Sequence, residues 1–296
     1  MRHLALCALL SWLTALAPFY VMGGLGDTTG VHPSHSCMLG TAAVGGGLFA
    51  GSLILLDRAW YADHPRSALH AFNDGREWLQ MDKAGHAFSA YTLGHWSHKA
   101  LDRCAPGERW PLWVGGGMGL LYLTGIEVLD GTSAEWGFSW WDMAANVTGS
   151  SLYIGQELLW SEQRMRLKLS AVPTDYAARR PTLLGETLPE RLLKDYNGQT
   201  IWLSVNVDLF LPEVGFPKWL NLAFGYGAEG MITSAPEPGD GRVRQFYLSP
   251  DLDLTRLPVR KPWLRTVLAV LNSIKVPAPS LEIDGSGRLR GHWMHF

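Results

Sequence analysis

The sequence predicts an α+β protein in which an N-terminal helical bundle is followed by a C-terminal antiparallel β-rich region. Two patterns along the chain support this class. Four apolar segments of helical length lie between residues 38 and 160, and strict alternation of apolar and polar residues appears only after residue 200. Tryptophan is abundant, with 14 residues, and its amphipathic ring favours clefts and membrane interfaces. We therefore expect an envelope protein with a leader at 1–25, a helical bundle at 38–168 and a β-rich region at 185–296.

The leader has the form of a secretory signal peptide or a short N-terminal anchor. Arg2 and His3 precede an apolar run from Leu4 to Leu16. Ala15-Leu16-Ala17 has the small-x-small form of a cleavage site, but Pro18 follows directly and hinders cutting. Cleavage and retention as an anchor therefore both stay open.

The three cysteines suggest little chemistry of their own. Cys7 has only six residues before it, which leaves no room for the apolar part of a lipoprotein signal, so we expect no lipidation there. Cys37 and Cys104 allow at most one disulfide in the mature chain, and no Cys-x-x-Cys pair indicates zinc or redox chemistry.

Each apolar segment is close to the length of about 20 residues that crosses a bilayer. The segments are Met38–Leu56, Ala84–Leu101, Leu112–Leu129 and Phe138–Trp160. The first and third are the stronger candidate spans, because the second carries three histidines and the fourth carries Asp142 and Asn146. Two alternatives follow: a four-helix membrane bundle, or a soluble or membrane-surface helical domain with an apolar core. Glycine triplets at 45–47 and 115–117 indicate close helix packing.

The second half of the chain has the patterning of a sheet. From Ile201 to Leu209 apolar residues alternate with polar ones, as in a half-buried strand. Further candidate strands are Leu220–Ala228, Phe246–Leu254 and Leu289–Phe296. Short strands joined by Gly-rich and Pro-rich connections predict an antiparallel sheet.

Charge and motif content exclude several functions. Lys and Arg number 25 against 27 Asp and Glu, with no long basic run, so nucleic acid is not an expected partner. The sequence contains no Gly-x-Ser-x-Gly and no His-Glu-x-x-His, which disfavours standard serine hydrolases and zinc peptidases. The cofactor and the metal, if any, stay unassigned.

A set of ionisable residues interrupts the apolar segments. In antiparallel helices, the start of the second, the end of the third and the start of the fourth meet on the same side. We expect one polar pocket there, with catalytic candidates His86, Lys83, Glu127 and Asp142, and binding candidates Asp130, Glu135 and Asn146. His86 suits a general base or metal ligand oriented by Glu127 or Asp142, and Lys83 suits an anion. The alternative is a structural network that fixes helix register.

Four motifs carry a family resemblance. Asp-Lys-Ala-Gly-His at 82–86, Ile-Glu-Val-Leu-Asp-Gly at 126–131, the stretch at 135–146 and Leu-Lys-Asp-Tyr-Asn-Gly-Gln-Thr at 193–200 resemble the YfiM-like family of uncharacterised bacterial envelope proteins. The helical half also resembles the VanZ-like membrane proteins, which are linked to glycopeptide tolerance. That resemblance implies a shared pattern of Lys83, His86, Glu127, Asp142, Asn146 and Gly149.

These observations leave two main functional hypotheses. The first is a membrane-bound enzyme that hydrolyses or transfers a group on an envelope lipid or glycan. The second is a non-catalytic envelope protein that binds or scaffolds a protein partner. A transporter is disfavoured, because the polar residues lie at helix ends and only four spans are available. In each case we expect the bacterial cell envelope, membrane-associated or periplasmic.

Overall fold

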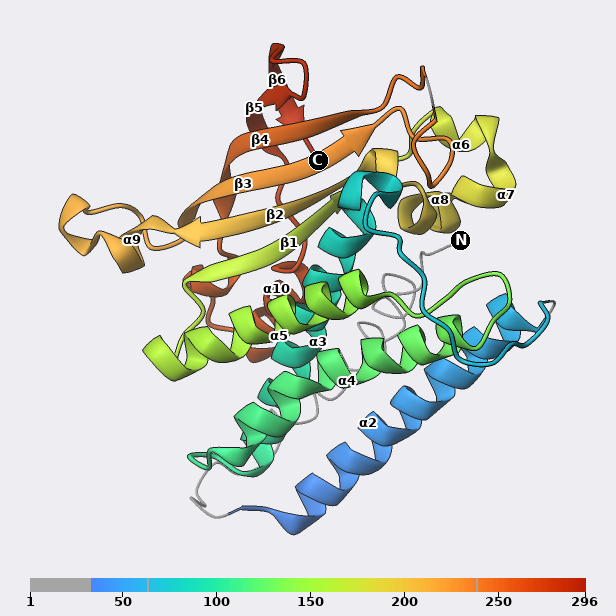
Figure 1. Cartoon of the computed structure of the whole chain (residues 1–296). Helices are drawn as coiled ribbons and strands as arrows, with labels where there is room; N and C mark the ends of the chain where they lie inside the picture. Colours follow the sequence, from blue (N-terminus) through green and yellow to red (C-terminus); the bar gives the residue numbers. More distant parts are fainter. Residues whose placement is uncertain (1–32, 63, 238) are drawn as a thin grey trace. The chain divides into compact units, whose positions relative to one another are not determined.

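The computed structural model describes residues 33–62, 64–237 and 239–296 (Figure 1). The expected leader at 1–25, its cleavage site and Cys7 lie outside the described residues. The chain divides into two compact units. Of the described residues, one unit combines Gly75–Phe88 with Gln163–Phe296, and the other combines 33–74 with Ser89–Glu162. Long helices precede residue 160 and an antiparallel sheet follows it, which confirms the predicted α+β class.

Four long helices occupy the predicted apolar segments. They are α2 His35–Leu56, α3 Met81–Cys104, α4 Trp110–Gly131 and α5 Trp140–Trp160. Two of them begin at serine N-caps: Ser34 accepts a hydrogen bond from the Cys37 amide at 3.4 Å, and Ser139 accepts one from the Asp142 amide at 3.1 Å. Such caps satisfy amides that the first helical turn leaves unpaired, so they fix where each helix starts.

Glycines let the backbones of α3 and α4 approach closely. A Cβ atom built on Gly119 would lie 2.1 Å from the carbonyl oxygen of Ala90, and one on Gly115 would lie 2.4 Å from the Cα atom of His98. The predicted close packing is thus confirmed at the second glycine triplet. The first triplet shows no such packing among the described residues, where a Cβ atom on any of residues 45–47 would meet nothing within 4 Å.

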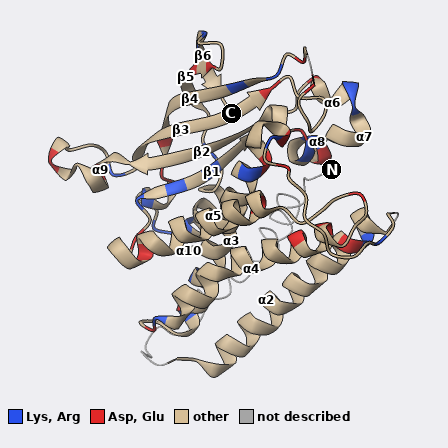
Figure 2. Ribbon diagram, viewed as in Figure 1, with Lys and Arg blue, Asp and Glu red and all other residues tan. Residues whose placement is uncertain are grey.

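Helix α2 is apolar and mostly uncovered. It carries no Asp, Glu, Lys or Arg, as Figure 2 shows. Only 6% of its most apolar stretch of 18 residues is buried. Among the described residues, α2 and α4 are long and apolar enough to cross a membrane. Helices α3 and α5 fail the same test, as their polar residues suggested. Length and composition alone are weak evidence of spanning, since a buried core helix or an N-terminal signal meets the same criteria.

One disulfide holds α2 to α3. Cys37 in the first turn of α2 bonds to Cys104, the last residue of α3, and this is the single pairing that the sequence allowed. Farther along α2, the Tyr122 hydroxyl of α4 donates a hydrogen bond to the Ser52 hydroxyl at 3.0 Å. The apolar helix is therefore held at its start by the disulfide and near its C-terminal end by the hydrogen bond.

The described residues form a six-stranded antiparallel sheet with the strands in sequence order (Figure 1). The strands are β1 Met165–Ala171, β2 Gln199–Asn206, β3 Leu220–Glu229, β4 Val243–Leu252, β5 Ala278–Asp284 and β6 Leu289–His295. Strands β2, β3, β4 and β6 were predicted, whereas β1 and β5 were not. The predicted strand at 201–209 ends early, because Asn206 caps the short helix α9 Val207–Phe210.

Short helices fill the connections of the sheet. Strands β1 and β2 are joined through α6 Tyr176–Arg179, α7 Pro181–Leu184 and α8 Leu188–Lys194, and β4 and β5 through α10 Pro262–Leu271. Single turns of other helix types occur at η1 Asp57–Tyr61, η2 Glu77–Gln80, η3 Tyr196–Gly198, η4 Pro212–Val214 and η5 Leu254–Arg256.

The sheet is polar on its buried face and apolar on its exposed face. Seven buried polar residues lie on β3, β4 and β5: Asn221, Gln245, Ser249, Asp251, Ser280, Glu282 and Asp284. The residues that alternate with them are exposed and apolar: Leu222, Phe224, Phe246, Leu248, Leu281 and Ile283. The usual interpretation of alternation, with apolar side chains inward, therefore fails here. Apart from an apolar cluster of Trp202, Ala223 and Tyr247, hydrogen bonds join the inward polar groups, as between Ser204 and Asp251 at 2.6 Å.

Candidate functional site

A left-handed turn fixes the start of α3. Trp78, Leu79 and Gln80 have φ values of 48°, 49° and 66°, a backbone region that costs non-glycine residues about 1–2 kcal/mol each. Tertiary contacts hold this turn: the Trp78 amide donates to the Ser234 carbonyl at 2.9 Å, and the Tyr226 hydroxyl donates to the Leu79 carbonyl. Consecutive strained residues persist only where the surroundings impose them, and they cluster at functional sites. No local pattern of residues predicted this turn.

The first residues after the turn are the predicted Asp-Lys-x-x-His pattern. The Lys83 ammonium donates to the buried Asp82 carboxylate at 2.6 Å, and the Lys83 amide donates to the same side chain at 3.0 Å. Lys83 is thus paired with a buried carboxylate. His86, one turn later on the same helix, is buried.

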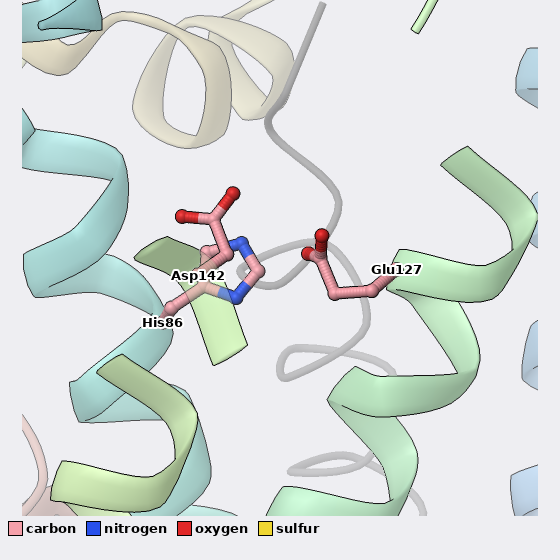
Figure 3. A group of neighbouring side chains, drawn as sticks. All are labelled: His86, Glu127 and Asp142. Atoms are coloured by element: carbon pink, nitrogen blue, oxygen red, sulfur yellow. The ribbon is translucent and has the colours of Figure 1, made fainter. Parts of the chain in front are cut away.

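Figure 3 shows His86, Glu127 and Asp142 as neighbouring side chains from α3, α4 and α5. One ligand atom from each lies within 4.8 Å of the others, and all three residues are buried. Asp74, Asp82 and Asp142 meet the same criterion, so Asp142 belongs to both groups. Three of the four predicted catalytic residues are thereby brought together, as the antiparallel order of the helices implied.

Ser139 organises the carboxylates around the start of α5. Its amide donates to Glu127 Oε2 at 2.9 Å, and its hydroxyl donates to Asp74 Oδ1 at 2.5 Å. The same hydroxyl accepts from the Asp142 amide at 3.1 Å. Neither Ser139 nor Asp74 was predicted from the sequence. The N-cap pattern Ser-Trp-Trp-Asp at 139–142 could have identified Ser139, whereas no local signal marks Asp74.

Asn146 lies one turn after Asp142 on the buried face of α5 and is itself fully buried. Asp142, Asn146 and Gly149 follow i, i+4, i+7 spacing and are all buried, and Tyr153 continues the same face. An amide side chain at this position can supply a donor or an acceptor beside the carboxylates.

The other two predicted binding residues lie elsewhere. Asp130 is buried and accepts a hydrogen bond from the Tyr61 hydroxyl at 2.6 Å. Burial, followed by the charge of Asp130, raises the pKa of Tyr61 well above its usual value, so the phenol stays protonated and donating. Glu135 is exposed in the connection between α4 and α5. Neither residue belongs to the two groups that share Asp142.

The donor set determines what the group around His86 can do. One imidazole nitrogen and two carboxylates suit a divalent transition ion such as zinc or manganese, and three protein ligands leave a coordination position for water or substrate. Without an ion, the same set can move protons, with His86 as the base and a carboxylate orienting its ring.

The comparisons with known proteins concern this same region. Residues 71–155 are similar to the family described as predicted periplasmic lipoprotein (DUF2279), and this stretch contains every predicted site residue. No curated protein and no solved structure showed a significant match. The match supports the expected kind of family, uncharacterised envelope proteins, whereas the YfiM-like and VanZ-like resemblances stay predictions.

The disulfide agrees with this description. Disulfides persist in oxidising compartments such as the bacterial periplasm, and the Cys37–Cys104 bond joins α2, which precedes the matched residues, to α3, which lies within them. The family description and the disulfide agree on the compartment, and the chain is an envelope protein of the periplasmic side.

Proposed function

We propose that this envelope protein is an enzyme that hydrolyses or transfers a group on an envelope lipid or glycan, with a divalent metal ion held by His86, Glu127 and Asp142. The observation that carries the proposal is the mutual approach of these three buried side chains within 4.8 Å. An ion held by these residues would supply a Lewis acid that lowers the pKa of a bound water.

The burial of these ionisable side chains favours a functional site over a chance arrangement. Removing a carboxylate or an imidazolium from water costs several kcal/mol unless partners or a metal compensate for it. Here three such groups come from three separate helices and sit beside a further pair of buried aspartates, Asp74 and Asp82. Clusters of buried ionisable groups are concentrated at active sites, although structural networks also produce them.

The substrate class follows from the setting. Helices α2 and α4 are apolar enough for a membrane, and the chain resides in the envelope. Lys83 lies one turn before His86 and can stabilise an anionic group such as a phosphate or carboxylate. Envelope lipids and glycans carry such groups, and this makes them the favoured substrates.

Mass spectrometry of envelope lipids and glycans tests the proposal. A deletion strain is complemented with wild type, His86→Ala or His98→Ala, and the abundance of each protein is measured. His98 is the matched control, because it is also a buried histidine of α3 but bonds to the Tyr153 hydroxyl at 2.6 Å, outside the cluster. We expect one species to accumulate in the deletion strain and with His86→Ala, but not with His98→Ala. An unchanged envelope, or full complementation by His86→Ala, would overturn the proposal.

A second candidate function rests on the sheet. Its exposed face carries Leu222, Phe224, Phe246, Leu248, Leu281 and Ile283, and large exposed apolar patches mark interaction sites. A scaffolding protein would use this face to bind an envelope protein, with the buried cluster fixing helix register. In that case His86→Ala lowers protein abundance or melting temperature, while Phe246→Ser abolishes function in a protein that still accumulates.

A further inference from the structure

We propose that α10 and the basic segment before it form a docking element for an anionic lipid bilayer, with the apolar side of the helix inserted among the lipid headgroups. This inference is independent of the buried cluster and would stand if the proposed enzymatic activity failed. It rests on the exposure of α10, on the charges that flank it and on the way the sheet holds it.

The apolar side of α10 is left uncovered. None of its ten residues is buried, although most are apolar. Trp263, Val267 and Leu271 follow i, i+4, i+8 spacing and are 56%, 40% and 44% exposed. Ile274, just after the helix, is 46% exposed. A helix of ten residues is about 15 Å long, so these side chains form a continuous stripe.

The charges around the helix are of one sign. From Leu254 to Leu281 the sequence contains no Asp or Glu. Arg260, Lys261 and Arg265 lie in this interval and are exposed at the N-terminal end of the helix. Two other basic residues are engaged: Arg256 pairs with Asp253 at 3.4 Å, and Lys275 is buried near Asp251.

The sheet holds the helix in a fixed position. After α10 the chain returns to β1, where the Leu169 amide donates to the Ser273 carbonyl and the Lys275 amide donates to the Leu169 carbonyl, both at 2.9 Å. Asn272, which caps the helix, accepts from the Lys168 ammonium at 3.0 Å. Because these bonds anchor its end, α10 presents its stripe without further ordering, which reduces the entropic cost of binding.

A lipid surface fits these features better than a protein does. An apolar stripe with tryptophan, flanked by exposed basic residues, is the pattern of helices that lie in the headgroup region of anionic membranes. The envelope localisation places such membranes within reach. An acidic protein could satisfy the charges, and the experiment separates the two.

The test places a fluorescent reporter on the stripe of the full-length protein. A Cys7→Ser background keeps the Cys37–Cys104 disulfide and permits labelling at Val267→Cys with an environment-sensitive dye. Leu188→Cys on α8 is the matched control, because Leu188 is also exposed but lies outside the segment from Leu254 to Leu281 that contains no acidic residue. The proteins are reconstituted into lipid nanodiscs of phosphatidylcholine alone or of phosphatidylcholine and phosphatidylglycerol in equal parts, each with a nitroxide-labelled lipid as quencher.

We expect the dye at position 267 to be quenched in the phosphatidylglycerol discs and the dye at position 188 to be unaffected. Arg260→Gln and Lys261→Gln should each reduce the ratio of docked to undocked helix about fivefold. High salt should act in the same direction. Equal quenching at the two positions would overturn the proposal. So would quenching at position 267 that changes neither with phosphatidylglycerol nor with the two substitutions. Shielding of position 267 that requires an added acidic protein instead of lipid would also contradict it.

Discussion

At the scale of single residues, the buried polar face of the sheet depends on a few charged side chains. The Lys168 ammonium lies 2.7 Å from Asp251 Oδ2 and donates to the Leu252 carbonyl at 2.7 Å. Burial lowers the pKa of Lys168, and the charge of Asp251 opposes that effect. Asp251 is thus the residue that keeps a buried cation compensated.

We predict that Asp251→Ala lowers the free energy of unfolding by about 3–5 kcal/mol, because removing one partner of a buried ion pair leaves the other uncompensated. Urea unfolding of the purified chain, followed by tryptophan fluorescence, measures the change. Glu213→Ala is the control, since Glu213 is exposed and should leave stability within about 0.5 kcal/mol. Equal stability of the two variants would show that the buried pair contributes nothing.

His295 gives the sheet a dependence on pH. Burial, followed by the charge of His292, lowers the pKa of His295 to about 4, while Glu282 opposes the shift and Lys275 adds to it. The unfolded chain binds a proton near pH 6.5, so between about pH 6.5 and 4 the unfolded state holds more protons than the folded state. The stability of the neutral form is therefore complete above about pH 6.5 and is lost as the pH falls through that window.

We predict that the melting temperature of wild type falls on acidification from about pH 7 to about pH 4.5, and that His295→Gln shows a smaller fall. Differential scanning fluorimetry at both pH values checks this. A parallel fall in the two proteins would assign the acid sensitivity to other groups.

At the scale of elements, the contact between α3 and α4 depends on glycine. We predict that Gly119→Ala lowers the free energy of unfolding by about 1–3 kcal/mol, because the new methyl group would lie 2.1 Å from the Ala90 carbonyl oxygen and must push the helices apart. Gly117→Ala is the control, since a Cβ atom there meets no described residue within 4 Å and alanine favours helix by about 1 kcal/mol. If the two variants are equally stable, the close approach of these helices is wrong.

The helices were predictable because apolar composition and length mark them directly. Strands β1 and β5 were missed for a common physical reason. Lys168 of β1 and Glu282 of β5 face inward and are buried, so the sequence patterns resemble solvated surface segments. When a sheet buries its polar face, alternation still indicates a strand but assigns the wrong side to the interior.

The candidate site was predictable to the extent that helix order sets it. His86, Glu127 and Asp142 meet because antiparallel helices bring those ends together. Asp74 was not predictable, because it lies in a connection whose path depends on tertiary contacts such as its bond from Ser139. Glu135 was predicted to belong to the site because it is close in sequence to Asp130 and Asp142. The path of the loop between α4 and α5 leaves its side chain exposed instead.

At the scale of the whole molecule, the disulfide links the compartment to stability. Cys37 and Cys104 are 67 residues apart, and closing a loop of that size stabilises a protein by about 4 kcal/mol in the chain-entropy description. We predict that Cys37→Ser protein exported to the periplasm accumulates to a lower level than wild type and melts at a lower temperature. Cys7→Ser should match wild type in melting temperature. A Cys37→Ser protein as stable as wild type would show that the disulfide does not stabilise the fold.

The most direct test of the central claim, that His86, Glu127 and Asp142 form a metal centre, is calorimetric titration of the chelator-treated full-length protein with zinc or manganese. We predict that wild type binds the ion and that Asp142→Asn weakens binding by about tenfold or more. Asp130→Asn is the control, because Asp130 is buried but bonded to Tyr61 and should leave binding unchanged. Absence of binding by wild type, or equal binding by wild type and Asp142→Asn, would contradict the claim.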